Sequence, residues 1–134
     1  MNIALEQHII EQLQIHKVSL VYLFGSYAEE TAQPMSDIDI GVVFSEEISP
    51  NSLGIYYNAM YNILADVFPE HSIDIVFLQM TSLELCFDVI RHGKILYAHS
   101  NDERYNFEEK TQILYADFKP LLDEFDSAII ERIQ

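Results

Sequence analysis

Three short apolar segments, set between stretches with helical spacing, constrain the fold of this 134-residue chain more than any other feature of its sequence. The segments Val18 to Phe24, Asp37 to Phe44 and Ile73 to Leu78 have the length and composition of buried strands. Ile95 to Tyr97 adds a shorter strand. Because helices and strands alternate along the chain, we predict an α/β (α+β) fold in which a small mixed sheet is flanked by helices.

The first half of the chain contains three segments with helical character. Residues 3–16 form an opening amphipathic helix. A short helix starts within residues 25–31, and Gln33-Pro34 ends it. A third helix follows the turn that begins at Ser49-Pro50. The apolar face of this third helix consists of Leu53, Tyr57, Met60, Leu64 and Phe68.

The second half contains two more helices. The first is capped by Thr81 or Ser82, and its apolar face carries Leu83, Phe87 and Ile90. His92-Gly93-Lys94 ends it, with a glycine and cations beside the negative end of the helix dipole. The second helix runs from Asn101 to the end of the chain with a kink at Pro120. It carries an apolar stripe made of Phe107, Leu114, Phe118, Leu121, Phe125, Ile129 and Ile133.

This stripe has two interpretations. In the first, the helix packs across the chain's own sheet. In the second, its half beyond Pro120 docks a partner or a second copy, with Glu124, Asp126 and Glu131 as an acidic rim. The length of the chain predicts a single domain over residues 1–134, with a core over about 1–100 and a C-terminal helical segment over 101–134.

Charge and composition exclude several classes of function. The chain has seven Lys and Arg and 22 Asp and Glu, which gives a formal net charge of −15. We therefore expect no direct nucleic acid binding. The acidity suits either a basic protein partner or solubility alone. Cys86 is expected to be a buried thiol, and the five histidines have no metal-site spacing. With no membrane span and no signal peptide in the sequence, we expect a cytoplasmic protein.

Gly25-Ser26 is the first candidate for chemistry. The pair lies where a buried strand turns toward a predicted helix, a geometry that presents backbone N–H groups and the positive end of a helix dipole. Glycine permits close approach of a phosphate, and the serine hydroxyl adds a donor. The alternative is an ordinary turn after a strand.

A set of aspartates is the second candidate. Asp37 and Asp39 point to one face of their strand, roughly 7 Å apart, where two unpaired carboxylates repel by about 2 kcal/mol at an effective dielectric near 20. Asp74 lies between Ile73 and Ile75 on the next strand and joins them if the two strands are neighbours. Such oxygen ligands favour Mg²⁺ shared with substrate phosphates. The alternative is that these carboxylates only face solvent.

The combination of these residues resembles the nucleotidyltransferase superfamily of polymerase-β type. Gly25-Ser26 is followed after ten residues by Asp37-Ile38-Asp39, and Asp74 lies in Ser-Ile-Asp-Ile-Val. The small size resembles the minimal branch of that superfamily, the MNT antitoxins that are paired with HEPN toxins. The resemblance implies a nucleotidyltransferase fold over residues 1–100.

The resemblance also implies an activity and its residues. Gly25 and Ser26 are expected to hold the β- and γ-phosphates of ATP, and Asp37 and Asp39 to bind two Mg²⁺ ions. Asp74 is expected to bind the second ion and to help deprotonate the acceptor hydroxyl. The implied reaction transfers AMP to a tyrosine of a HEPN ribonuclease toxin and silences it, with toxin and antitoxin forming a hetero-oligomer.

One departure from the family pattern bears on nucleotide binding. Many members read Gly-Ser-x-Ala-Arg-Gly, whereas Glu29 and Glu30 stand here in place of the arginine and glycine. Lys17, Lys94 or a residue of the partner is then needed to offset the triphosphate charge. Two other functions stay open: nucleotide transfer to a small molecule such as an aminoglycoside, and a non-catalytic antitoxin that neutralises its partner by contact.

Overall fold

The computed structural model of this chain describes residues 3–32 and 36–133, with side chains described as far as residue 126. Its elements are α1 (Gln7–Ile15), β1 (Val18–Phe24), β2 (Ile38–Phe44), α2 (Leu53–Ala65), β3 (Ile73–Phe77), α3 (Leu83–His92), β4 (Lys94–Ala98) and α4 (Asn101–Ile133). Single 3-10 turns over Pro50–Ser52 and Leu78–Met80 complete the order. Each strand begins and ends within one residue of the bounds predicted for it.

The four strands form one mixed sheet in the order β3-β2-β1-β4. Strand β1 is antiparallel to both of its neighbours, and β2 and β3 are parallel. A parallel pair needs a crossover connection, which α2 provides. The predicted fold class is therefore confirmed.

This topology gives the sheet two chemically different ends. The C-terminal end of β1 and the first residues of β2, β3 and β4 meet at one end, which we call the aspartate end because it holds Asp39 and Asp74. We call the opposite end, where β1 begins and α4 follows β4, the serine end, after Ser19, Ser45 and Ser100.

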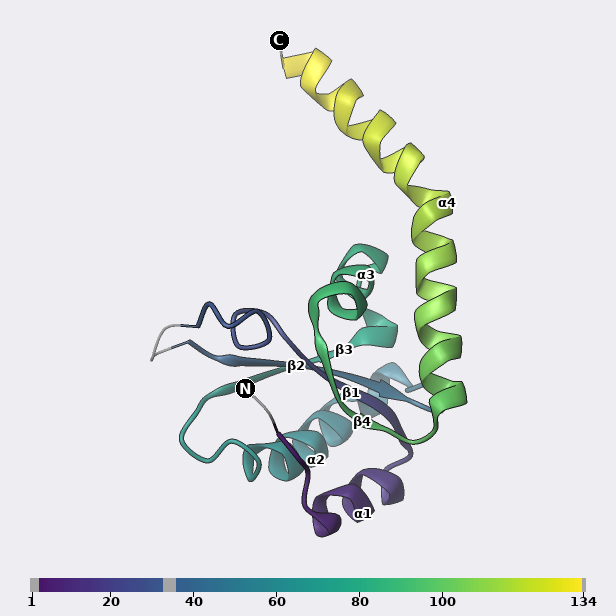
Figure 1. Cartoon of the computed structure of the whole chain (residues 1–134). Coiled ribbons are helices and arrows are strands. Elements are labelled where there is room, and N and C mark those ends of the chain that lie inside the picture. The colour runs from purple at the N-terminus through teal and green to yellow at the C-terminus, as the bar shows by residue number, and fades with distance from the viewer. Residues whose placement is uncertain (1–2, 33–35, 134) are drawn as a thin grey trace.

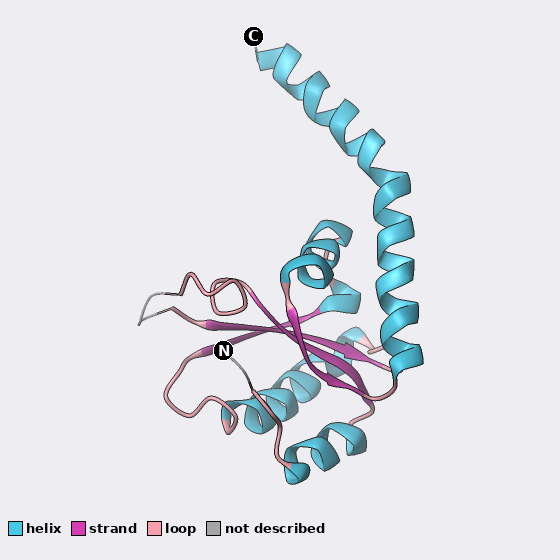
Figure 2. Cartoon of the chain, viewed as in Figure 1, coloured by secondary structure: helices cyan, strands magenta, loops and turns pink. Residues whose placement is uncertain are grey.

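Helices cover both faces of the sheet (Figures 1 and 2). Helices α1 and α2 pack on one face, over a core that includes Leu13, Ile40 and Leu64. Helix α3 and the first half of α4 cover the other face, where Tyr22 and Cys86 are buried. The expectation of a buried thiol is confirmed: the Cys86 thiol donates to the Leu78 carbonyl at 3.0 Å, and burial raises its pKa.

The expected apolar faces of α2 and α3 are partly wrong. Cys86 and Val89, rather than the predicted set, are the buried residues of α3. The reason is long-range, since Phe87 is turned toward α4 and stacks on Tyr115 with ring centroids 3.9 Å apart. In α2 the buried residues are Met60, Ile63 and Leu64, whereas Tyr57 is exposed. The Ser82 cap is confirmed, because its hydroxyl accepts from the Leu85 amide at 3.1 Å.

Two predicted segments near the N-terminus also differ. The opening helix is shorter than residues 3–16. Residues 25–30 form turns and no helix, because Gly25 and Glu30 both adopt left-handed conformations, with φ of 74° and 61°. A residue with positive φ cannot continue a right-handed helix. The expected helix end at Gln33-Pro34 lies outside the described residues.

The first half of helix α4 is anchored to the sheet and to α3. The Tyr22 hydroxyl donates to Glu108 at 3.0 Å, and Arg104 Nε donates to the same carboxylate at 2.9 Å. Burial raises the pKa of Tyr22, so this phenol stays a donor. Past the contact between Phe87 and Tyr115 the helix changes direction and projects away from the sheet, as expected for a helix that contains Pro120 (Figure 1).

The apolar stripe of α4 is therefore divided. Phe107 packs in the core on the α3 side of the sheet. Phe118, Leu121 and Phe125 are 45%, 59% and 65% exposed, so the first interpretation of the stripe fails for this part of the helix. The side chains of Ile129 and Ile133 lie outside the described set. In the part of the chain that the structure describes, no helix has the length and apolar character to cross a membrane.

Candidate active site

Gly25 closes the end of β1 in a position that only glycine fits. Its φ of 74° is unfavourable for any residue with a Cβ. A Cβ at this position would also clash with Oδ2 of Asp39 on the neighbouring strand. The turn that follows is closed by two backbone bonds, from the Glu29 amide to the Gly25 carbonyl at 3.1 Å and from the Thr31 amide to the Ser26 carbonyl at 2.8 Å. The predicted phosphate turn thus lies directly against a predicted metal ligand.

The sheet register brings the aspartates together. Asp39 pairs with Phe24 of β1 on one side and with Asp74 of β3 on the other. Asp37 lies just before β2, and its side chain is exposed like that of Asp74. The pKa of Asp39 is raised, first by burial and then by the negative charges of Asp74 and Asp37. Asp74 was expected to lie with the other two aspartates only if their strands were neighbours, and β2 and β3 do pair directly.

The chemistry of this donor set fits Mg²⁺. Within residues 3–32 and 36–126, no three His, Cys, Asp or Glu side chains already lie close enough to enclose an ion by themselves. Mg²⁺ does not require such a cage, because it is commonly held by one or two carboxylates together with waters and substrate phosphates. A cation would also relieve the repulsion that raises the pKa of Asp39.

The structure adds a contact that the sequence did not predict. Tyr27, which follows Ser26, shares a hydrogen bond with His71 Nδ1 at 3.2 Å, and the two rings meet edge to face. His71 lies shortly before β3, the strand that carries Asp74. The contact therefore links the turn at residues 25–30 to the segment just before the strand that carries Asp74. An aromatic residue beside Gly-Ser was the only local signal, and nothing in the sequence links positions 27 and 71.

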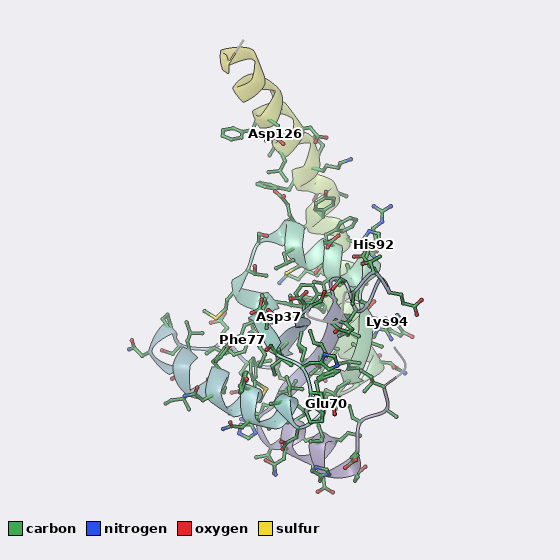
Figure 3. The ribbon with its side chains drawn as sticks, turned by 90° about the vertical axis from the view of Figure 1, so that its left-hand side faces the viewer. Asp37, Glu70, Phe77, His92, Lys94 and Asp126 are labelled. Carbon is green, nitrogen blue, oxygen red and sulfur yellow. The ribbon has the colours of Figure 1, made fainter. Side chains whose placement is uncertain are left out.

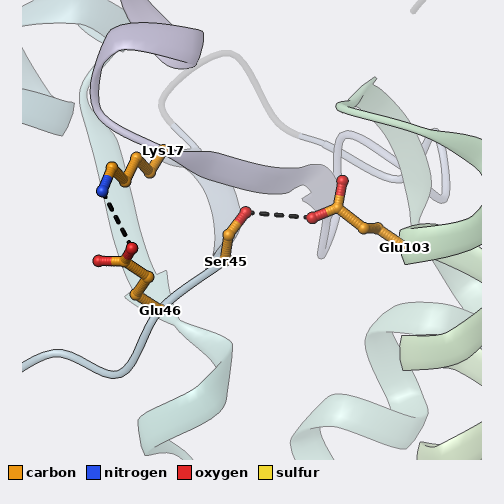
Figure 4. Close-up of polar contacts among 4 residues, drawn as sticks. All are labelled: Lys17, Ser45, Glu46 and Glu103. Atoms are coloured by element: carbon orange, nitrogen blue, oxygen red, sulfur yellow. Dashed lines mark hydrogen bonds and ion pairs between the residues drawn. The ribbon is translucent and has the colours of Figure 1, made fainter.

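The structure also separates the two lysines that the sequence offered as cations for the triphosphate. Lys17 lies at the serine end, where its ammonium is paired with Glu46 at 2.9 Å (Figure 4). Lys94 begins β4 opposite Leu23, and its Nζ lies 3.7 Å from Oε1 of Glu30 in the phosphate turn. Figure 3 looks onto the aspartate end, with Asp37 near its middle and Lys94 to one side. Lys94, not Lys17, is at the site.

This fold and site define a nucleotidyltransferase. Residues 7–102 match the family described as polymerase beta, nucleotidyltransferase, and the chain belongs to that family. It is 34% identical over 112 residues to the protein adenylyltransferase MntA of Shewanella oneidensis. This match covers 82% of this chain and 76% of that protein. The resemblance seen in the motifs is thereby confirmed.

Solved structures show the same similarity. One is the crystal structure of a toxin–antitoxin with AMP-PNP, which matches with a TM-score of 0.62 at 29% identity and covers 87% of this chain and 94% of that one. Another is the tri-AMPylated Shewanella oneidensis HEPN toxin in complex with an MNT antitoxin, with a TM-score of 0.58 at 27% identity. That match covers 88% of this chain and 92% of the other.

Proposed function

We propose that this chain is a Mg²⁺-dependent protein adenylyltransferase that transfers AMP from ATP to a tyrosine hydroxyl of a HEPN-type ribonuclease toxin and silences it. The observation that carries the proposal is the register at the aspartate end, which sets Asp39 between the Gly25 turn and Asp74. The similarity to MntA, and to a complex whose toxin is AMPylated, supports the acceptor class.

Each site residue has a proposed role. Gly25 admits the triphosphate to the turn because it has no side chain, and Ser26 donates its hydroxyl to a β- or γ-phosphate oxygen. Asp37, Asp39 and Asp74 hold Mg²⁺ in this scheme. When bound, Mg²⁺ supplies positive charge that neutralises phosphate oxygens, which is most of what phosphoryl transfer needs.

The chemical step places demands on the acceptor and on Asp74. The acceptor tyrosine oxygen forms a bond to the α-phosphorus of ATP while the bond from that phosphorus to the α–β bridging oxygen breaks. Pyrophosphate leaves, and the phenolic proton passes to the Asp74 carboxylate. A phenol has a pKa near 10, so Asp74 alone would be a weak base for it, and positive charge from bound Mg²⁺ would help the phenol to ionise.

The partner follows from the same similarities. The toxin–antitoxin structures support a hetero-oligomer of this chain with a HEPN toxin. The formal charge of −15 favours a basic partner surface. Action in the cytoplasm and a domain that spans residues 1–134 stay predictions.

The test is a transfer assay with a purified HEPN-type toxin as the acceptor. ATP labelled at the α-phosphate, with Mg²⁺, should label the toxin on tyrosine, and ATP labelled at the γ-phosphate should not. Labelled toxin should also lose its ribonuclease activity. The matched control is the same toxin with its acceptor tyrosine changed to phenylalanine.

The other outcomes identify the competing functions. Label on an added aminoglycoside and none on protein would show a small-molecule nucleotidyltransferase. Silencing of the toxin without any label, retained in Asp39→Asn, would show a non-catalytic antitoxin that acts by contact.

A further inference from the structure

Glu30 has a backbone conformation that its residue type does not favour. Its φ of 61° lies in the left-handed region, which glycine adopts freely and residues with a Cβ adopt at a cost. The residue lies in the turn that starts at Gly25, one position before Thr31, whose amide closes the turn onto Ser26. A strained conformation of this kind persists only where the surrounding structure holds the residue in place, and such residues cluster at functional sites.

The side chain of Glu30 contacts an ammonium group. Lys94 Nζ lies 3.7 Å from Glu30 Oε1, with the two side chains 42% and 72% exposed. An exposed ion pair of this kind contributes little to stability. The pair with Lys94 therefore does not by itself account for a strained glutamate at this position.

The position of Lys94 is fixed by the strand start. A Cβ on the preceding residue, Gly93, would approach the Leu23 carbonyl oxygen to 2.9 Å, so this glycine packs closely on the end of β1. Lys94 itself pairs with Leu23, two residues before Gly25. The ammonium group is thus held beside the turn that is proposed to receive the triphosphate.

Charge makes this lysine relevant to the nucleotide. A triphosphate brought next to Asp37, Asp39 and Asp74 needs positive charge, and lysine binds phosphate well as a point charge. Lys17, the other lysine with a described glutamate partner, is committed to Glu46 at the serine end.

We infer that Lys94 binds the β- or γ-phosphate of the nucleotide, and that Glu30 holds its ammonium group at the turn until the phosphate displaces the carboxylate. The inference rests on the proposed function and adds to it a phosphate-binding residue and a competing anion. Glu30 and Lys94 then act on nucleotide affinity in opposite directions, although they form one ion pair.

The experiment measures the affinity of the full chain for AMP-PNP by calorimetry in the presence of Mg²⁺. Lys94→Gln should weaken binding by about tenfold, as expected for a lost charge-assisted hydrogen bond. Glu30→Gln should tighten binding several-fold. Lys94→Arg should stay close to the unmodified chain, and Lys17→Gln, which breaks the matched pair at the serine end, should have no effect.

Opposite signs separate this role from a structural one. Lys94→Gln and Glu30→Gln both break the ion pair, so a purely structural role would change affinity in the same direction in both variants. Melting temperatures measured alongside would show that each variant folds. Unchanged affinity in Lys94→Gln, with normal binding by the unmodified chain, would overturn this inference alone. If the unmodified chain did not bind AMP-PNP, both the inference and the proposed function would fall.

Discussion

At the serine end of the sheet one carboxylate has three hydroxyl donors, whereas at the aspartate end one carboxylate, Asp39, has two negatively charged neighbours. Glu103 accepts hydrogen bonds from Ser19 at 3.3 Å, Ser45 at 3.1 Å and Ser100 at 3.2 Å, and the Ser100 hydroxyl accepts from the Glu103 amide (Figure 4 shows the bond from Ser45). The bond from the Glu103 amide to the Ser100 hydroxyl is an N-cap that starts α4.

The aspartate end has the opposite arrangement. Asp39 is partly buried, and its pKa is raised by burial and by two neighbouring negative charges. Such a group destabilises the folded state when it is ionised. At the serine end, three hydroxyl donors satisfy the Glu103 carboxylate, which lies in the first turn of α4. At the aspartate end, Asp39 instead lies beside two other carboxylates, at the site proposed to bind substrate and cation.

The largest expected effect tests the aspartate end directly. Asp37→Asn or Asp39→Asn should reduce AMP transfer by about 1000-fold, because several kcal/mol of charge stabilisation depend on these ligands. The fold should stay intact, and the melting temperature of the metal-free protein should not fall. Glu47→Gln, an exposed change near the serine end, is the control. Full activity in either aspartate variant would remove these residues from the catalytic site.

The next effect concerns the turn beside Asp39. Gly25→Val should weaken binding of an ATP analogue by about 100-fold, because a Cβ clashes with the carboxylate and the positive φ becomes strained. Ser26→Ala should weaken it by about tenfold, the loss of one hydrogen bond to a charged group. Calorimetric titration checks both. Equal affinity in both variants would show that the turn does not hold phosphate.

At the serine end the expected effect is on stability. Glu103→Ala should lower the free energy of unfolding by about 2 kcal/mol, since it leaves three hydroxyls without their acceptor. Denaturant titration measures this change, and Glu109→Ala on the exposed side of α4 is the control. AMP transfer per folded molecule should not change. A loss of transfer larger than the loss of folded protein would contradict the separation of the two ends.

Changes in α4 beyond Pro120 are expected to have a smaller effect, and only on binding of the partner. Leu121→Ser combined with Phe125→Ser should weaken binding to the HEPN toxin by about tenfold, because these exposed side chains extend the stripe that docks it in the second interpretation. Stability should stay unchanged. Tyr105→Ser, which removes an equally exposed aromatic residue nearer the start of α4, is the matched control. Unchanged toxin binding in the double variant would leave the stripe without this role.

The smallest effect is a pH dependence that belongs to Asp39. Its pKa in the folded protein lies above the ordinary value of 3.8, so the folded state takes up this proton before the unfolded state does. As the pH falls through this window, the metal-free protein should gain stability relative to Asp39→Asn. Melting temperatures of both proteins across acidic pH measure the difference. A constant difference would show that the pKa of Asp39 is not raised in the folded protein.

Local features of the sequence were enough to predict the strands and the face of β3 on which Asp74 lies. A run of apolar residues such as Val18 to Phe24 forms a strand in any compact sheet, and alternation places Asp74 opposite its flanking isoleucines. The turn at residues 25–30 was mistaken for a helix because Gly25 is fixed by contact with a carboxylate of another strand.

Contacts between distant segments account for the remaining differences. The face of α3 depends on Tyr115 of α4, and the position of Tyr27 depends on His71. The choice between Lys17 and Lys94 depends on which end of β1 each one meets. None of these pairs is linked by a period or a motif, so no pattern in the sequence could reveal them.

The close packing of Gly25 on Asp39 has an evolutionary consequence. The two positions are fourteen residues apart in sequence, yet the carboxylate occupies the space that a side chain at position 25 would need. A mutation that enlarges residue 25 causes a clash while the aspartate remains, and one that shortens residue 39 removes a proposed metal ligand before any new side chain can use the space. Stepwise change at either position therefore passes through an inactive intermediate, and descendants of this chain are expected to keep both residues or to lose both together.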